Sequence, residues 1–464
     1  MTKITPHPHQ AEALEAIANS TADKGRIVMP TGAGKTLVEA FVLRDAINDH
    51  SETRIHLVLA PRIALVNQLI REYRSFAGQN YIAVAFHSGT HEPDYTKVKW
   101  SETSTTKVDA VKAELDKAEK LGKDLVVFST YASCHKLIGF NFTTLIADES
   151  QYCTAENFFD SIRDLSAARK LFFTATERHA LSAAGRGLNN VDVFGEVIYQ
   201  VAPQTLIDGG YIVAPRLHVM SASAKSDGYT VIDEVINAAT KQVELSETMP
   251  VRKVLFAMNG TADVAEVVEN MDKIKAALPG YTIFTIVSNS KFGAMVDGVK
   301  HARGNWMKEL RDCDNALIFH YDILSEGIDV DGITGVVLLR NMQHAKLLQT
   351  IGRAVRVYKA NPSAKPYAWV TVVSINGNDE SRDHVASVFN MIRSGGFDAN
   401  VETVKFTDTM VSGIAEDPEI EDIVGLDRAG QAKATLEGII HEIEVAEALN
   451  GLRAQDVANA SEDF

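Results

Sequence analysis

The segment Met29-Pro-Thr-Gly-Ala-Gly-Lys-Thr36 has the residue types of a phosphate-binding loop. Glycines at two positions allow backbone conformations closed to other residues, so successive N–H groups can point at phosphate oxygens. Lys35 can reach the β- and γ-phosphates, and the Thr36 hydroxyl can bind magnesium. We therefore expect a nucleoside triphosphate to be held by Thr31, Gly32, Ala33, Gly34, Lys35 and Thr36.

A second segment, Asp148-Glu-Ser-Gln151, supplies two adjacent carboxylates after a short apolar run. Asp148 can hold the magnesium ion that bridges the phosphates, together with Thr36. Glu149 is then placed to orient and deprotonate the attacking water. The pair predicts that the bound nucleotide is hydrolysed, with ATP and Mg²⁺ as the cofactors and Lys35 and Glu149 as catalytic residues.

These segments must be positioned by a sheet, and the first half of the chain alternates apolar runs with helical spacing. The predicted strands are 26–29, 55–60, 82–86, 125–129, 144–147 and 170–174. Strands that alternate with helices predict a parallel sheet with helices on both faces, whose ligands bind at the carboxyl ends of the strands.

A second series of predicted strands covers 216–220, 254–258, 282–287, 316–321, 335–339 and 368–373. The sequence therefore predicts an α/β fold of two parallel-sheet domains with the nucleotide cleft between them. We expect a first domain at 1–203, a linker rich in proline and glycine at 204–215, a second domain at 216–375, and a mainly helical acidic extension at 376–464.

Composition agrees with two domains and excludes several classes of protein. The chain has 464 residues, of which 45% are hydrophobic and 23% charged, as in soluble globular proteins. No apolar stretch is long enough to span a membrane, and three dispersed cysteines argue against disulfides and zinc clusters. We expect no membrane partner and a cytoplasmic setting, in a bacterial or phage-infected cell.

The net charge of −15 does not by itself favour a nucleic-acid partner. The acidic residues are concentrated at the end of the chain, because 414–464 holds thirteen acidic and three basic residues. That segment carries −10 and the remaining residues only −5. A mildly acidic body can still present a basic groove, since binding depends on the local potential.

The order of the motifs resembles that of superfamily 2 helicases over about residues 5–373. Pro8-His-Gln10 resembles the adenine-reading element, in which Gln10 would bind the base. The segment 60–68, which includes Arg62, resembles a motif that contacts a nucleic-acid backbone, and so do His87-Ser-Gly89 and Ser129-Thr-Tyr131. The resemblance implies two tandem RecA-like domains, and DNA contacts from Arg62, Ser88, Gly89, Thr130 and Ser325.

The resemblance continues in the second domain. Ser325-Glu-Gly-Ile-Asp329 resembles motif V, in which Gly327 and Asp329 would face the nucleotide. Gln349-Thr-Ile-Gly-Arg-Ala-Val-Arg356 resembles motif VI, which implies catalytic roles for Gln349, Arg353 and Arg356. The two arginines, expected one turn apart on a helix, would stabilise the charge on the γ-phosphoryl group.

The segments 195–200 and 206–215 resemble the crossing between domains in DNA-acting members of the superfamily. The sequence therefore predicts an ATP-dependent DNA helicase or translocase, and the resemblance to phage-type recombination helicases implies branched DNA as substrate. Three alternatives stay open. They are an RNA helicase, the motor subunit of a restriction system, and a nucleotide-switched clamp that does not travel.

Overall fold

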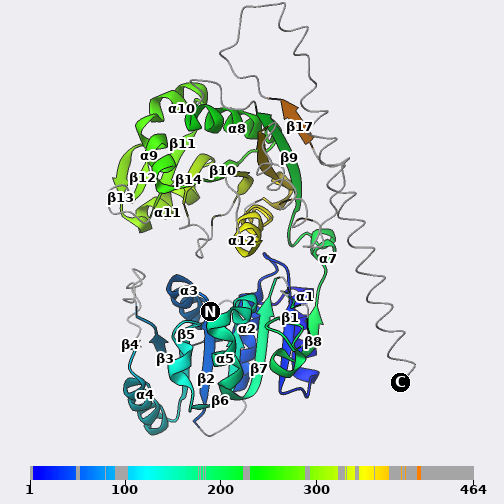
Figure 1. Ribbon diagram of the computed structural model, residues 1–464, viewed down its shortest axis with the longest axis vertical. Coiled ribbons are helices and arrows are strands. Elements are labelled where there is room, and N and C mark those ends of the chain that lie inside the picture. The colour runs from blue at the N-terminus through cyan, green and yellow to red at the C-terminus, as the bar shows by residue number, and fades with distance from the viewer. Residues whose placement is uncertain are drawn as a thin grey trace, which may run out of the picture. The chain divides into compact units, whose positions relative to one another are not determined.

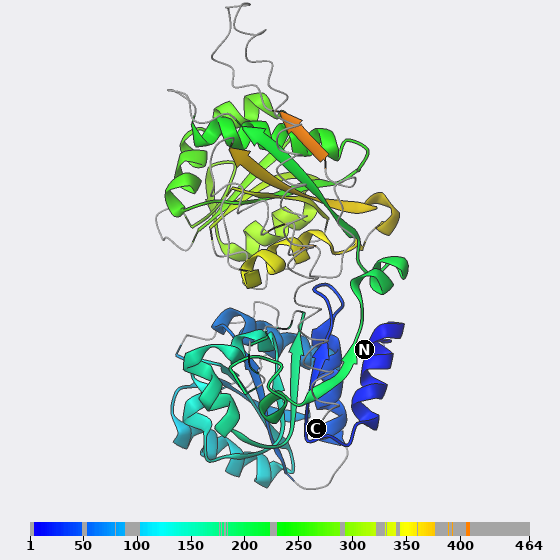
Figure 2. The same ribbon diagram turned by 45° about the vertical axis from the view of Figure 1, so that its right-hand side comes forward.

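The computed structural model describes residues 4–48, 53–78, 80–88, 103–175, 177, 179, 180, 182, 184–222, 230–287, 293–321, 330, 332–339, 344–359, 361–375, 388, 392 and 405–408. The chain forms two compact units, Met1–Gly209 and Gly210–Phe464 (Figures 1 and 2). Their division falls inside the segment 204–215 that the sequence singles out as a linker.

The first unit is built on an eight-stranded sheet in which every neighbouring pair of strands is parallel. In spatial order the strands are β4 (Thr103–Thr105), β3 (Tyr81–Phe86), β5 (Asp124–Thr130), β2 (Ile55–Ala60), β6 (Asn141–Ala147), β7 (Ser166–Thr174), β1 (Lys24–Val28) and β8 (Glu196–Gln200). Because all strands run the same way, their carboxyl ends lie along one edge of the sheet.

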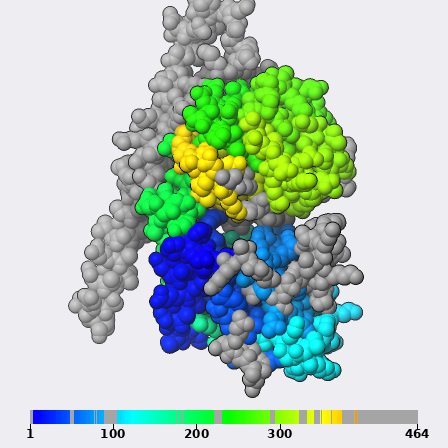
Figure 3. All heavy atoms as spheres, turned by 180° about the vertical axis from the view of Figure 1, so that it is seen from behind, coloured from blue at the N-terminus to red at the C-terminus, as the bar shows by residue number. Residues whose placement is uncertain are grey.

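Helices cover both faces of this sheet, as Figure 1 shows. The helices of this unit are α1 (Pro8–Asn19), α2 (Lys35–Asn48), α3 (Ile63–Ala77), α4 (Val108–Leu121), α5 (Glu156–Asp164), α6 (Val191–Phe194) and α7 (Pro203–Asp208), which follows β8, with the 3-10 turns η1 (Cys134–Leu137) and η2 (Ser150–Thr154). Val127 of β5 packs on the side of α4 and α5. Its neighbour Phe128 points the other way and meets Tyr73 of α3 edge-on, with ring centroids 5.6 Å apart. The first unit is thus a three-layer α/β structure, with α1 seen at its surface in dark blue (Figure 3).

The second unit holds a nine-stranded sheet. In spatial order its strands are β13 (Val299–His301), β12 (Ala294–Val296), β11 (Thr282–Ile286), β14 (Asn315–His320), β10 (Arg252–Ala257), β15 (Ile333–Leu338), β16 (Tyr367–Ile375), β9 (Ala214–Ala222) and β17 (Lys405–Asp408). The strands from β11 to β17 are parallel, and β12 and β13 add an antiparallel hairpin at one edge.

Two apolar layers bury this second sheet. One contains Trp306 of α11 (Arg303–Asp312) and Leu347 and Ile351 of α12 (His344–Ala354). The other contains residues of α8 (Val231–Leu245), α9 (Thr261–Glu269) and α10 (Met271–Ala277). A 3-10 turn, η3 (Pro362–Ala364), precedes β16. The second unit is therefore also a three-layer α/β structure.

The predicted α/β class with two parallel-sheet domains is confirmed. Each predicted strand is present, whereas β4, β8, β12 and β13 are not among the predicted strands. In β8, residues 196–200 pair with β1 as an edge strand instead of only crossing between domains. The extension 376–464 lies outside the described residues, apart from residues 388 and 392 and the strand β17. Among the helices that the structure describes, none is long and apolar enough to cross a membrane.

Candidate nucleotide-binding site

The predicted site residues of the first unit lie at the carboxyl ends of its strands, and the strand order divides them into two groups. The phosphate loop follows β1, Asp148 follows β6, and Thr174 ends β7, which lies between them. Arg62, Ser88 and Thr130 follow or end β2, β3 and β5, which are also adjacent. One half of the edge therefore carries the predicted nucleotide residues, and the other half the predicted nucleic-acid residues.

The phosphate loop has the backbone geometry that its glycines predict. Gly32 and Gly34 have φ of +90° and +78°, in the region that favours glycine. The Met29 N–H donates to the Thr174 carbonyl at 2.9 Å, which anchors the start of the loop to β7. Lys35 begins α2, is buried, and its Nζ donates to the Met29 carbonyl at 3.3 Å. The helix start and the lysine thus form a cationic cradle that suits phosphate groups.

Gln10 packs directly under this loop. Its Nε2 donates to the Ala33 carbonyl at 3.0 Å, and its Oε1 accepts a hydrogen bond from the His7 N–H at 2.9 Å. His9 Nε2 lies 2.9 Å from the same Ala33 carbonyl. In this structure the Gln10 amide therefore supports the loop with both of its ends, and its predicted role in binding adenine stays a prediction.

Asp148 and Glu149 occupy the turn after β6. The Glu149 N–H donates to Oδ1 of Asp148 at 2.9 Å, which fixes the buried aspartate carboxylate. Burial raises the pKa of Asp148 to about 7, and the charge of Glu149 adds to this while Lys35 opposes it. Glu149 has φ of +51°, a conformation that costs a non-glycine residue roughly 1–2 kcal/mol and is concentrated at functional sites.

Gln151 connects this turn to β7. Its Nε2 donates to Oε2 of Glu149 at 2.9 Å, and its Oε1 accepts from the Thr174 hydroxyl at 2.8 Å. Because the Thr174 carbonyl also holds the Met29 N–H, the chain of hydrogen bonds runs from the phosphate loop to Glu149. A glutamine can donate at one end and accept at the other, which an aspartate at this position cannot do.

A further carboxyl group, that of Glu39 on α2, lies beside these residues and is fully buried. The Tyr73 hydroxyl donates to its Oε2 at 2.9 Å, whereas Oε1 receives no hydrogen bond from a described donor. Burial raises the pKa of Glu39 well above its ordinary range, the Asp148 charge raises it further, and Tyr73 and Lys35 act in the opposite direction. The sequence analysis missed Glu39, although its spacing of four residues from Lys35 places both on one face of α2.

These oxygen atoms suit a hard divalent cation. Asp148 and Glu39 have carboxyl groups, Thr36 offers a hydroxyl in the first turn of α2, and Glu39 has a buried oxygen without a described donor. Magnesium prefers oxygen ligands and binds beside phosphates through one or two carboxylates. The site therefore fits Mg²⁺, with Thr36 and Asp148 as the predicted ligands.

The other half of the edge contains a direct contact to the nucleotide half. The Tyr131 hydroxyl donates to the Asp148 carbonyl at 2.6 Å, and Tyr131 follows Thr130 at the end of β5. Arg62 caps α3 and lies close enough to Tyr152 to lower the pKa of that phenol, against the larger effect of burial. Ser88 is exposed just after β3. One hydrogen bond therefore connects the end of β5, where the predicted nucleic-acid residue Thr130 lies, to the predicted cation ligand Asp148.

In the second unit, Arg353 lies in the last turn of α12 and is 8% exposed. The expectation that Arg356 lies one turn further on the same helix is wrong. The helix ends at Ala354, and Arg356 forms an isolated antiparallel bridge with Ile212. The buried Lys365 ammonium donates hydrogen bonds to the carbonyls of Ala354 and Arg356. These bonds satisfy carbonyl groups at the carboxyl end of the helix, and the chain is not helical beyond Ala354.

Several predicted residues cannot be placed. Gly89, Ser325, Gly327 and Asp329 lie outside the described residues, and the side chain of Gln349 on α12 does too. Within the part that is described, no cluster of three histidine, cysteine or acidic side chains could hold a metal ion. A magnesium site here would consequently depend on hydroxyl, phosphate and water oxygens in addition to carboxylates.

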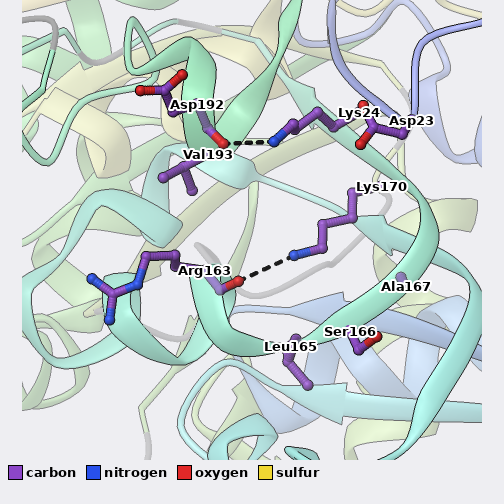
Figure 4. A pocket seen from close by; sticks show the side chains of 9 residues that line it. All are labelled: Asp23, Lys24, Arg163, Leu165, Ser166, Ala167, Lys170, Asp192 and Val193. Carbon is purple, nitrogen blue, oxygen red and sulfur yellow. Dashed lines mark hydrogen bonds between the residues drawn. The ribbon is translucent and has the colours of Figure 1, made fainter.

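A separate hollow lies at the opposite edge of the first sheet, where β1 and β7 begin. Figure 4 shows its lining, in which Lys24 Nζ donates to the Asp192 carbonyl at 2.6 Å and Lys170 Nζ to the Arg163 carbonyl at 3.3 Å. Asp23 also lines it, so acidic and basic groups are mixed. None of the predicted site residues belongs to this hollow, which is therefore distinct from the nucleotide site.

Comparison with protein families gives a match over the first unit. Residues 3–179 match the family described as "Type III restriction enzyme, res subunit". That range contains the phosphate loop, Asp148 and Glu149, and the hydrogen bonds that join them. No curated protein sequence matches the chain.

Solved structures share the fold of both units at low sequence identity. The ATP-dependent Type ISP restriction-modification enzyme LlaBIII bound to DNA matches with a TM-score of 0.70 and 15% identity, over 93% of this chain and 33% of that chain. A nuclease-deletion mutant of the Type ISP enzyme LlaGI in complex with a DNA substrate mimic matches with 0.62 and 18%, over 86% and 30%. S. cerevisiae Dbp5 bound to RNA and ADP BeF3 matches with 0.51 and 14%, over 91% and 93%.

The chain thus spans about a third of the length of the two restriction-modification enzymes. These likenesses confirm the prediction of two tandem RecA-like domains.

Proposed function

We propose that this chain, whose order of motifs resembles that of superfamily 2 helicases, hydrolyses ATP with Mg²⁺ and uses the energy to move along or remodel DNA. The observation that supports the proposal is that the predicted nucleotide residues and the predicted nucleic-acid residues lie on two halves of one sheet edge. Tyr131 joins the two halves through its hydrogen bond to the Asp148 carbonyl.

In the hydrolysis that we propose, each residue has a separate task. The loop N–H groups and Lys35 hold the phosphates, and Thr36 and Asp148 hold Mg²⁺, which neutralises charge on the phosphate oxygens. Glu149 orients and deprotonates water, and Gln151 keeps the Glu149 carboxylate in place. Arg353, with Arg356 as a second candidate, stabilises the γ-phosphoryl charge, and loss of such an arginine lowers rates on the order of 10³–10⁵.

DNA binding is proposed through Arg62, Ser88, Gly89, Thr130 and Ser325. Hydroxyls, backbone N–H groups and a few cations bind phosphates without reading the sequence. Movement should therefore be independent of sequence and weaken as salt rises. The first substrates to try are forked and four-way DNA, because the order of motifs resembles that of recombination helicases.

A second candidate is the motor of a restriction system, acting on duplex DNA. The family match of the first unit and the likeness to two restriction-modification enzymes favour it. A motor that moves along duplex DNA displaces a third strand bound to that duplex, whereas a junction-specific helicase can act without displacing such a strand. Triplex displacement in the presence of ATP separates these two functions.

The test of the proposed function is ATP hydrolysis measured with no nucleic acid and with single-stranded, forked, four-way and duplex DNA, and with RNA. We expect DNA to stimulate hydrolysis, and Lys35→Ala to abolish it. Stimulation by RNA alone would replace DNA by RNA as the substrate. ATP-dependent binding without any strand displacement would indicate a clamp, and the absence of stimulation by every nucleic acid would contradict a motor.

A further inference from the structure

Glu39 has no role in the hydrolysis described above, yet it is buried near the charges of Asp148 and Lys35. It lies on α2 four residues after Lys35, the nearby charge of Asp148 adds to the rise in its pKa, and none of its surface is exposed. Burying a carboxyl group next to another is costly unless a cation or a proton compensates. A carboxyl group that is buried beside a phosphate loop in spite of this cost is a candidate functional residue.

Among the described residues, Tyr73 is the hydrogen-bond donor to the side chain of Glu39. Its Oε2 accepts the Tyr73 hydroxyl at 2.9 Å, and Oε1 is buried without a described donor. Tyr73 is itself fully buried and packs edge-on against Phe128 of β5, so the hydroxyl that anchors the carboxylate is rigid. One oxygen of Glu39 is thus fixed by Tyr73, and the other can interact with a partner in the site.

We propose that Glu39 is a positioning residue of the divalent-cation site, where its Tyr73-anchored carboxylate acts through Asp148 to strengthen the binding of Mg²⁺ with the nucleotide. Groups behind a metal ligand orient that ligand and raise its affinity for the metal, and their loss costs about 10–100-fold in affinity. The inference rests on the proposed nucleotide function, because it concerns the same site.

A rival role is available from the same geometry. The Lys35 ammonium also opposes the rise in the pKa of Glu39, so Glu39 could serve only to place the lysine. The two roles differ in what they change. A partner of Lys35 affects nucleotide binding with or without metal, whereas a partner of Asp148 affects only the part of the affinity that Mg²⁺ adds.

The experiment uses the full chain and a fluorescent ATP analogue, whose affinity is measured in EDTA and across a series of Mg²⁺ concentrations. Glu39→Gln keeps the shape of the side chain and removes its charge, and Tyr73→Phe removes only the anchor. Asp124→Asn is the matched control, because it neutralises a buried carboxylate that pairs with His56 at the beginning of β5, on the opposite edge. Melting temperatures are recorded for all variants.

We expect Glu39→Gln to raise the Mg²⁺ concentration at half-effect by about 10–100-fold, with binding in EDTA no weaker than in the wild type. Tyr73→Phe should shift it in the same direction by less, and Asp124→Asn should not shift it. An unchanged Mg²⁺ dependence in Glu39→Gln overturns the inference, whatever happens to the melting temperature. Equal weakening in EDTA and in Mg²⁺ also overturns it, in favour of the Lys35 role. Failure of the wild type to bind nucleotide in a Mg²⁺-dependent way would instead contradict the proposed function itself.

Discussion

Gln151 donates a hydrogen bond from Nε2 to Oε2 of Glu149 at 2.9 Å, and so links the predicted catalytic carboxylate to β7. The other end of the same amide accepts the Thr174 hydroxyl. Because the Thr174 carbonyl also accepts the N–H of Met29, the first residue of the phosphate loop, hydrogen bonds connect Glu149 to that loop. The connection passes through the Gln151 amide, which donates a hydrogen bond at one end and accepts one at the other.

Replacing Gln151 by Glu should lower kcat for ATP by roughly 10–100-fold while leaving KM nearly unchanged, because a misplaced catalytic group loses orientation more than binding. The new carboxylate repels Glu149 and cannot donate to it. Thr174→Val removes the hydroxyl at the other end and should also lower kcat. Since both variants break one chain of bonds, the double variant should cost less than the product of the two single effects. Strictly multiplicative effects in steady-state kinetics would refute the chain.

The raised pKa of Asp148 predicts a pH dependence of cation binding. The folded state keeps a proton on Asp148 up to a pKa of about 7, whereas the unfolded chain releases it near the ordinary value of about 4. Without a cation, the contribution of Asp148 to the free energy of unfolding therefore falls as pH rises through this window. Mg²⁺ competes with that proton, so the rise in melting temperature given by Mg²⁺ and nucleotide should grow from pH 6 to pH 8. A rise independent of pH would show that Asp148 is already ionised.

Gly34 should resist substitution for two separable reasons. Its φ is +78°, and a Cβ atom there would lie 2.3 Å from Nε2 of Gln10. Gly34→Ala should therefore destabilise the first unit and weaken nucleotide binding. Gly122→Ala is the matched control, because Gly122 has a φ of +59° with nothing within 4 Å of the added Cβ, so it has the conformational cost of about 1–2 kcal/mol alone. Equal losses of unfolding free energy in the two variants, measured by denaturant, would mean that the contact with Gln10 has no consequence.

Tyr131→Phe tests the link between the two halves of the sheet edge. The change removes the hydroxyl that donates to the Asp148 carbonyl and keeps the ring in the core. We expect basal ATP hydrolysis to fall little, and its stimulation by DNA to fall several-fold, as expected for a coupling of about 1 kcal/mol. DNA-binding affinity serves as the control. If basal and stimulated rates fall equally, the hydroxyl supports the cation site and does not couple it to DNA.

Much of the fold follows from sequence because buried parallel strands are continuous apolar runs that end in polar residues. Residues 55–60 form β2 with the bounds that the pattern predicts, and the motif residues lie at the strand ends. The strands β4, β8, β12 and β13 do not follow from the pattern. In β8, residues 196–200 alternate weakly and are only partly buried as an edge strand. The spacing of Arg353 and Arg356 predicts one helix that holds both, but the helix ends at Ala354. The Lys365 ammonium binds the carbonyls of Ala354 and Arg356, and a contact with a residue so much further along the chain is not contained in the local spacing.

The residues of the candidate site could be predicted where their spacing along the chain identifies them. They could not be predicted where contacts between distant parts of the chain bring them together. Lys35, Thr36, Asp148 and Glu149 could be identified from the chain. The contacts of Gln151 with Glu149 and Thr174 depend on the order of β6 and β7 in space, which no local pattern contains. Tyr73 on α3 and Glu39 on α2 meet only because two helices pack on the same face of the sheet.

We propose that ATP cleavage by this chain requires Arg353 of the second unit as well as the phosphate loop of the first. The most direct measurement is the DNA-stimulated rate of ATP hydrolysis by Arg353→Ala, with DNA and nucleotide affinities recorded on the same preparation and Lys35→Ala as the inactive reference. We predict a loss on the order of 10³-fold or more in rate, with DNA binding retained. Hydrolysis at the wild-type rate by Arg353→Ala would contradict the account.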